Sequence, residues 1–480
     1  MTALPPNRVL WCVMAATCIV FAPMAAEFYL VTVTASTATY AKVLGSFVSE
    51  EYAFGPRSGF AQMTPYWRSM PPLNQLILGV HAALASVALL VGPVQFLGGA
   101  RERWPKLHRG AGRIYFLAGV PSILLSMVYL CITPMEEIYG GPPFAIGLWG
   151  IAILTLFTFG LGLMQVLKGQ IAAHRATMVL NFSALLIAPL LRVWWGVLGW
   201  IFLDQPFNGQ DHSHTAVLMF LGLETLMGAI VVMHVYGDTL PHRTEPSSLK
   251  QLRKTALKWL PAATKWGTLL GGGLGFVVFH EYLLRFVGPF DLFPGLRNAD
   301  FTLREGEVFS DYSWAFVCKS IGLATLLLCS PQRIRQLFLT LPSPPTRATE
   351  VAFNLGWLVA SAGWVGQALG FGMHGVSGWG SSVYWLACAL AMVVLGTLRL
   401  HSARHGRLRK VRELTLHIFA LALTPLTFLV LQACFLAAAF TWEDAFLSAG
   451  VLATSINLSF SYYYTGYGLR NAAPRTARGV

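Results

Sequence analysis

Long apolar runs separated by short polar or charged segments follow one another along most of this 480-residue chain. Each run is close to the roughly 20 apolar residues that a helix needs to cross a lipid bilayer. The first run continues past Ala25 to Val31, so it predicts an uncleaved span rather than a signal peptide. The pattern predicts an all-α integral membrane protein with about twelve spans, at 9–35, 74–98, 112–132, 144–167, 176–203, 215–236, 265–287, 313–330, 350–372, 380–400, 414–440 and 444–464.

The composition excludes a water-soluble globular protein. Charged residues make up only 11% of the chain, hydrophobic residues make up 55%, and the mean hydropathy is +0.58. A soluble domain has about 25% charged residues, which it needs to cover its surface. All seven cysteines lie within apolar runs and none forms a CxxC pair, which argues against a disulfide framework or a thiolate zinc site. The motifs typical of hydrolases are absent from the sequence.

The net charge of +13 reports membrane orientation. Most Lys and Arg residues fall in alternate segments between the predicted spans, and this alternation is the positive-inside bias. It predicts that both termini are cytoplasmic and that the protein lies in the cytoplasmic (inner) membrane. The basic segments then face anionic lipid headgroups, which makes membrane lipid the expected partner and excludes nucleic acid.

A polar segment with three prolines divides the chain into two sets of six spans. The predicted parts are a six-span bundle over 1–236, a cytoplasmic linker over 237–264 and a second six-span bundle over 265–480. Each half opens with one span, a long outer loop and five closely spaced spans, a layout typical of a parallel duplication. The stretches 184–190 and 420–426, which each end in Pro-Leu, resemble one another. Duplication and chance similarity of apolar segments both account for this layout.

A motif of histidines, arginines and a few other residues lies around the second to fifth predicted spans. Their order is H…G-P-x-Q-F…H-R-x-x-G-R-x-Y…H-R-x-x-M, and its members are His81, Gly92, Pro93, Gln95, Phe96, His108, Arg109, Gly112, Arg113, Tyr115, His174, Arg175 and Met178. Over roughly residues 74–200 the chain resembles an uncharacterised family of bacterial multi-pass membrane proteins, a domain of unknown function. The resemblance implies a helical membrane module and implies no activity.

Histidines near both faces of a helix bundle are typical of haem iron held by two imidazoles. His108, His174 and His234 lie at the cytoplasmic ends of predicted spans, so two of them are expected to ligate an inner haem b. His81 lies about 10 Å inside the outer edge of its span, and His212 or His214 would pair with it at an outer haem. Arg109, Arg113 and Arg175 would hold the haem propionates or an anionic partner such as a quinone.

This arrangement is similar to cytochrome b561-like electron carriers, so the leading hypothesis is a haem-binding membrane electron-transfer protein with a separate redox partner. Those carriers place two histidines on one helix about four turns apart, and no span here does. The alternative is that the histidines are interfacial residues that contact phosphates and bind no metal.

Charged residues inside the spans support further hypotheses, because they are costly in a bilayer and often functional. Arg192 and Glu224 are predicted to form an intramembrane ion pair that fixes the packing of the fifth and sixth spans. Lys319, Glu27 and Glu224 favour a solute transporter or permease. The remaining alternative is a non-catalytic scaffold that binds lipid or a partner subunit.

Overall fold

The computed structural model describes residues 6–30, 39–51, 55, 59–97, 100–193, 306–338, 347–375, 378–406 and 408–464. The chain divides into two compact units, Met1–Thr239 and Leu240–Val480. The predicted linker 237–264 spans the boundary between them and lies outside the described residues. Each unit is a helical bundle and is described separately below.

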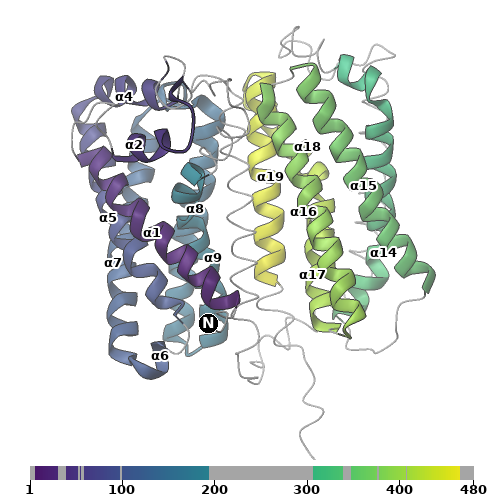
Figure 1. Ribbon diagram of the computed structural model, residues 1–480, viewed down its shortest axis with the longest axis horizontal. Helices are drawn as coiled ribbons and strands as arrows, with labels where there is room; N and C mark the ends of the chain where they lie inside the picture. The colour runs from purple at the N-terminus through teal and green to yellow at the C-terminus, as the bar shows by residue number, and fades with distance from the viewer. Residues whose placement is uncertain are drawn as a thin grey trace, which may run out of the picture. The chain divides into compact units, whose positions relative to one another are not determined.

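Within its described residues, the first unit contains four helices long and apolar enough to cross a membrane, and Figure 1 shows how its helices are arranged. Prolines stand in the first turn of α5, α7 and α8, where the missing N–H costs no hydrogen bond. The elements are α1 (Pro6–Leu30), α2 (Thr39–Gly45), α4 (Gly59–Ser69), α5 (Pro72–Gln95), α6 (Ala100–Arg103), α7 (Pro105–Ile132), η1 (Met135–Glu137), α8 (Gly141–Leu167) and α9 (Ile171–Leu185). After Leu186 the chain bends by 45° into a further helical segment, Ile187–Val193.

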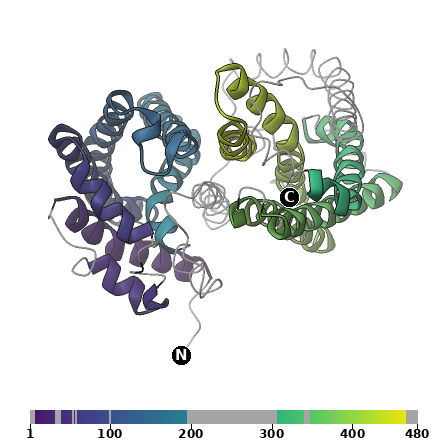
Figure 2. The ribbon, with the colours of Figure 1, turned by 90° about the horizontal axis from the view of Figure 1, so that it is seen from above.

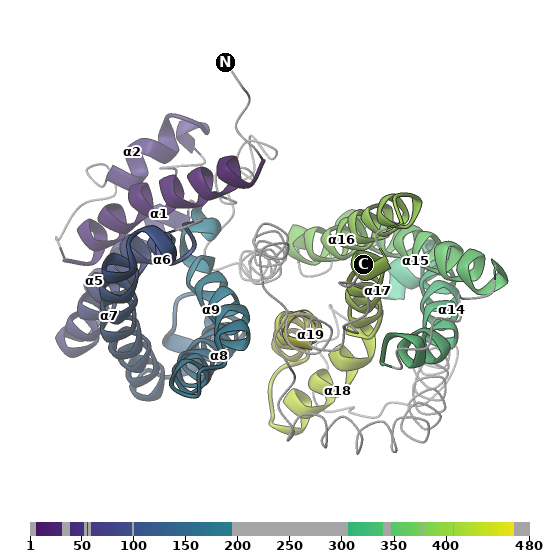
Figure 3. The same ribbon diagram turned by 90° about the horizontal axis from the view of Figure 1, so that it is seen from below.

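Four helices of the first unit form a closed ring, in which α5 packs on α7, α7 on α8, α8 on α9, and α9 on α5. The end-on views in Figures 2 and 3 show this ring, with α1 packed outside it against α5. Glycines allow the close contacts: a Cβ atom built on Gly92 would lie 2.2 Å from the Phe182 ring, and one on Gly119 would lie 2.4 Å from the Phe159 ring. Small residues at helix contacts are typical of membrane bundles, in which tight packing replaces the hydrophobic effect.

The second unit contains α14 (Ser313–Phe338), α15 (Arg347–Met373), α16 (Gly378–Arg404), α17 (Leu408–Ala422), α18 (Thr424–Ala437) and α19 (Trp442–Tyr464). Helices α14, α15, α16 and α17 pack in that order, and α17 closes the ring on α14. A Cβ atom on Gly363 would lie 2.3 Å from the Lys319 backbone nitrogen, and one on Gly322 would lie 2.3 Å from that of Ala360. The backbones of α14 and α15 therefore touch along a seam of small residues.

The prediction of a multi-pass helical membrane protein is confirmed. The described residues form helices and no strands. Six helical stretches are long and apolar enough to cross a membrane: Trp11–Leu30, Pro72–Gln95, Pro105–Ile132, Gly141–Leu167, Ser382–Arg404 and Glu413–Ala437, the last of which runs through α17 and α18. The bent pair Ala173–Leu185 and Ile187–Val193 makes a seventh if it crosses as one span. The predicted spans 215–236 and 265–287 lie outside the described residues, so the count of twelve and the side of each terminus stay predictions.

Candidate functional site

The histidines of the motif, together with Gln95 and Tyr115, lie at contacts between the helices of the first unit. His81 on α5 has its Nδ1 atom 2.8 Å from the Ser122 carbonyl oxygen on α7, and the Ser122 hydroxyl donates to the His81 carbonyl at 3.0 Å. Because a carbonyl oxygen only accepts, Nδ1 carries the proton of the neutral His81 ring and Nε2 carries the lone pair. His81 is therefore an oriented side chain that joins two helices.

A second contact between α5 and α7 lies at their opposite ends. The Gln95 amide donates to the His108 carbonyl oxygen at 3.0 Å. A Cβ atom on Gly112 would lie 3.2 Å from the Gln95 side-chain oxygen, so glycine there leaves room for the amide. From the pair 81 and 122 to the pair 95 and 108, the chain advances by 14 residues along α5 and goes back by 14 along α7. Helices α5 and α7 therefore run antiparallel with one continuous register.

Tyr115 connects α7 to α9 across the ring. Its hydroxyl donates to the Asn181 side-chain oxygen at 2.7 Å, and the Asn181 amide donates to the Thr155 carbonyl and to the Thr158 hydroxyl on α8, each at 2.9 Å. Tyr115 and Asn181 are buried, at 2% and 0% exposure. Three helices therefore meet at one hydrogen-bonded polar centre inside an apolar bundle.

His174 lies near the start of α9 and contacts the end of α8. Its Nδ1 atom lies 2.8 Å from the Gly162 carbonyl oxygen, so in the neutral ring Nδ1 is protonated and Nε2 carries the lone pair. A Cβ atom on Gly162 would lie 2.7 Å from the Met178 sulfur. The buried Thr177 hydroxyl donates to the Gln165 side-chain oxygen at 2.7 Å. The motif residues at this end of the bundle therefore hold α9 against α8.

His108 and His174 occupy the same level of the bundle. Tyr115 follows His108 by seven residues on α7, and Asn181 follows His174 by seven on α9. Helix α7 runs antiparallel to α8, because Tyr129 and Leu130 lie near Ala145 while Tyr115 lies near Phe159. Helix α9 also runs antiparallel to α8, because His174 lies near Gly162 while Asn181 lies near Thr155. Seven residues are about two turns, or about 10 Å along the axis. Both histidines therefore lie about 10 Å from the Tyr115–Asn181 hydrogen bond, toward the end at which α7 and α9 begin, called the proximal end below.

The arginines of the motif are placed differently from one another. Arg109 and Arg113 are exposed, four residues apart on one face of α7, and the Arg109 Nε atom donates to the Pro105 carbonyl. Further along the same face Leu117 is 71% exposed, as expected of a helix that faces lipid. Arg175 is half-buried on α9. Arg109 and Arg113 therefore point away from the ring.

Other predicted site residues fall in two groups. Arg192 is half-buried; it donates to the Ala188 carbonyl at 3.2 Å and lies 5.5 Å from the centre of the Phe21 ring. Glu224, its predicted ion-pair partner, lies outside the described residues, as do His212, His214 and His234. The Arg192–Glu224 pair and the ligand pairs that include these histidines stay predictions.

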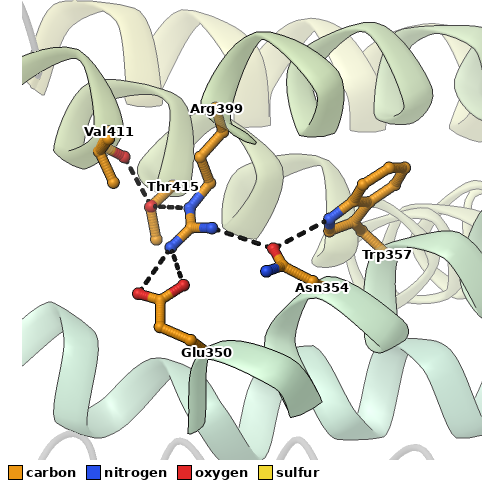
Figure 4. Close-up of polar contacts among 6 residues, drawn as sticks. All are labelled: Glu350, Asn354, Trp357, Arg399, Val411 and Thr415. Carbon is orange, nitrogen blue, oxygen red and sulfur yellow. Dashed lines mark hydrogen bonds and ion pairs between the residues drawn. The ribbon is translucent and has the colours of Figure 1, made fainter. Parts of the chain in front are cut away.

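The second unit contains a buried charged cluster that the sequence pattern did not single out (Figure 4). Arg399 is 1% exposed, and one of its terminal nitrogens contacts both Glu350 carboxylate oxygens, at 3.1 and 2.9 Å. Its other nitrogens donate to the Asn354 side-chain oxygen at 3.0 Å and to the Thr415 hydroxyl at 2.8 Å. Its guanidinium lies 4.7 Å from the Phe353 ring centre. In the sequence Arg399 stands at the edge of a run of basic residues, as a cytoplasmic anchor does. The structure places it inside α16, five residues before its end, and buries it.

Lys319 makes a second polar contact within the helices of the second unit. Its Nζ atom donates to the Gln367 side-chain oxygen at 2.6 Å, and it lies 4.9 Å from the Phe316 ring centre and 5.3 Å from that of Trp385. Gln367 is 2% exposed. An amide oxygen and two aromatic faces therefore stabilise the ammonium group between α14, α15 and α16.

In the described part of the chain, no group of three or more His, Cys, Asp and Glu side chains is arranged to hold a metal ion. Residues 78–232 match a family model described as "Predicted membrane protein (DUF2306)". No curated protein and no solved structure matches the chain. The resemblance to an uncharacterised membrane protein family is therefore confirmed over this stretch, whereas the exact motif stays a prediction. The family description assigns no activity.

Proposed function

We propose that the first unit is a haem-binding electron-transfer module of a multi-pass protein in the bacterial cytoplasmic membrane. His108 and His174 would be the axial ligands at the proximal end, which would face the cytoplasm together with both termini. Bound haem would supply one-electron transfer to a redox partner or a quinone. The proposal builds on two findings: the chain has several helices that could cross a membrane, and residues 78–232 match a family of membrane proteins with no assigned activity.

The common level of His108 and His174 is the observation that carries the proposal. Histidine that ligates a metal through Nε2 usually donates its other ring N–H to a carbonyl or a carboxylate, which fixes the tautomer. His174 makes this contact with Gly162, and His81 makes it with Ser122. The donor set therefore fits haem iron: two imidazoles at one level, one of them held in the ligating tautomer. His81 would serve an outer haem with His212 or His214.

The motif arginines fit this proposal in a modified form. Arg175 is half-buried next to His174 and is the arginine best placed to contact a haem propionate. Arg109 and Arg113, which are exposed on the outer face of α7, are better placed for lipid phosphates or an anionic partner that approaches from the cytoplasm. Their position also supports a cytoplasmic proximal end, because basic residues accumulate on that side.

The test is an absorption spectrum of the full chain, purified in detergent from cells supplied with a haem precursor. We expect the oxidised-minus-dithionite-reduced spectrum to show a Soret shift with α and β bands. His108→Ala and His174→Ala should each remove the contribution of the proximal haem, leaving at most that of the outer haem at His81, without changing the elution volume or helix content. His405→Ala is the matched control, because His405 is exposed just after the end of α16 and its Nδ1 atom bonds the His401 carbonyl. A colourless wild-type protein, or full colour in both variants, would contradict the proposal.

Lys319 supports a second candidate function, the transport of an anionic solute through the second unit. A cation held by an amide and two aromatic rings between three helices is typical of an intramembrane binding group. In proteoliposomes, Lys319→Ala should abolish uptake of a carboxylate or phosphate solute that the wild-type protein transports, and Arg404→Ala should not. Equal uptake by wild type, Lys319→Ala and protein-free vesicles across a panel of such anions would exclude this candidate.

A further inference from the structure

The two units build their helix rings in the same order. In the first unit α5, α7, α8 and α9 are consecutive neighbours and α9 closes on α5; in the second, α14, α15, α16 and α17 do the same and α17 closes on α14. Consecutive antiparallel helices commonly form rings, so order alone does not establish a common origin. The details within the helices are more informative.

The second half of each ring matches residue by residue. Helices α8 and α16 each have 27 residues, and α9 and α17 each have 15. Three residues join each pair, and the middle one is a left-handed glycine, Gly169 with φ 68° or Gly406 with φ 65°. A single break residue then ends the shorter helix, Leu186 in one unit and Leu423 in the other. All of these features are offset by 237 positions, which an unrelated pair of bundles has no reason to share.

Side-chain contacts agree with the same correspondence. The eleventh residues of α7 and α15, Tyr115 and Trp357, contact the nineteenth residues of α8 and α16, Phe159 and Gly396. Likewise the twenty-second residue of α8 or α16 contacts the eighth residue of α9 or α17. In the first unit this second contact is Gly162 with Met178, and in the second it is Arg399 with Thr415.

The correspondence places the Arg399 cluster where the first unit has its histidines. His108 and Glu350 are the fourth residues of α7 and α15, and Gly162 corresponds to Arg399. His174 corresponds to Val411, and Gly112 to Asn354. The second unit therefore lacks both histidines and instead has a buried arginine bonded to a carboxylate, an amide and a hydroxyl.

We infer that the second unit is a duplicated copy of the first. Its proximal end, at which α15 and α17 begin, is closed by the Arg399–Glu350 ion pair, so that of the two proximal ends only that of the first unit binds a ligand. Arg399 stands at the position that corresponds to Gly162, and its N–H groups donate to protein oxygens. Glu350 and Val411 stand where the first unit has His108 and His174, so this end has no imidazole from those positions to ligate a metal. The family match to residues 78–232, within the first unit, agrees with a second copy that has diverged. The identity of the ligand as haem rests on the proposed function.

Thermal unfolding of the full chain in detergent tests the ion pair without reference to haem. Arg399→Ala and Glu350→Ala should each lower the melting temperature, and the double variant should lose clearly less than the sum of the two, because both remove one interaction. Arg404→Ala, an exposed arginine one turn further along α16, should change nothing. Unchanged melting temperatures, or additive losses, would contradict the inference that the Arg399–Glu350 ion pair closes this end of the second unit.

Haem content per chain tests the single site. The wild-type protein should bind one proximal haem, lost in His108→Ala, while folded Arg399→Ala should keep the wild-type spectrum and haem content. A His108→Ala variant that retains a histidine-ligated haem abolished by Arg399→Ala would place a second site in the second unit and overturn the inference. A colourless wild-type protein would defeat the proposed function instead, and the thermal measurements would then decide whether the second copy is closed by its ion pair.

Discussion

The Tyr115 hydroxyl donates to the Asn181 side-chain oxygen at 2.7 Å, with both residues buried in the first ring of helices. This hydrogen bond sets α7 and α9 in a common register and thereby brings His108 and His174 to one level. Because the Asn181 amide also binds Thr155 and Thr158 on α8, the position of α9 depends on a polar centre whose members satisfy one another.

Removal of the Tyr115 hydroxyl should destabilise the protein. Tyr115→Phe leaves the buried Asn181 oxygen without its donor, and interhelical hydrogen bonds in membranes contribute about 0.6–2 kcal/mol. We expect this loss in the free energy of unfolding, measured by denaturant titration in mixed micelles. A double-mutant cycle with Asn181→Ala should show a coupling of similar size. Purely additive effects would mean that the two residues do not support one another.

Gly92 should tolerate no side chain. A Cβ atom there would lie 2.2 Å from the Phe182 ring, so Gly92→Ala must push α5 and α9 apart or move a ring that is 2% exposed. We expect a lower melting temperature, partly restored by Phe182→Leu in the same chain. Gly110→Ala is the matched control, since nothing lies within 4 Å of a Cβ atom at Gly110 and alanine favours helix. Equal melting temperatures for the two alanine variants would contradict the packing described.

Tyr66 should contribute a pH-dependent part of the stability at the end of the first unit opposite the proximal end. The Tyr66 hydroxyl donates its one proton to the Glu137 carbonyl and accepts from the Tyr139 N–H. In its contact with the Tyr129 hydroxyl, Tyr66 therefore accepts and Tyr129 donates. Burial raises the pKa of the Tyr66 phenol above its ordinary value of 10.0. The protonated form is the one favoured by folding, so its contribution is complete below about pH 10 and declines as pH rises through the raised pKa.

The measurement is the free energy of unfolding of wild type and Tyr66→Phe across this range. Tyr66→Phe should be less stable by about 1 kcal/mol at pH 8, and the difference should shrink above pH 10. A difference that stays constant to high pH would show that folding leaves the pKa of the Tyr66 phenol unchanged.

Topology reporters test the orientation on which the functional proposal depends. A reporter fused after Gly140, which precedes α8, should be periplasmic, and one fused after Lys250 should be cytoplasmic, because the basic segments stay inside. Alkaline phosphatase activity should appear only in the first fusion and green fluorescence only in the second. If both fusions report the same side, the predicted alternation of spans is wrong.

The sequence by itself determined that this is a multi-pass helical membrane protein and where most of its described helices lie. The predicted span 74–98 corresponds to α5 (Pro72–Gln95) and 144–167 to α8 (Gly141–Leu167). This succeeds because a bilayer imposes a minimum apolar length, and length and hydropathy are properties of consecutive residues. The sequence also identified His81, His108 and His174 as polar residues of interest, because ionisable groups are rare in apolar segments.

Only the tertiary structure decided what these residues touch. The register of α7 and α9 sets His108 and His174 at one level, and it depends on side chains such as Tyr115 and Asn181 that are far apart in the chain. The same limit applies to Arg399, which resembles a surface anchor in the sequence and is 1% exposed in the bundle. Burial and partner choice depend on how separate helices pack, and a hydropathy pattern records only the average environment along each helix. The physical reason is that Glu350, Arg399 and Thr415 come from three different helices and contact one another only when the ring closes. No stretch of consecutive residues predicts that contact.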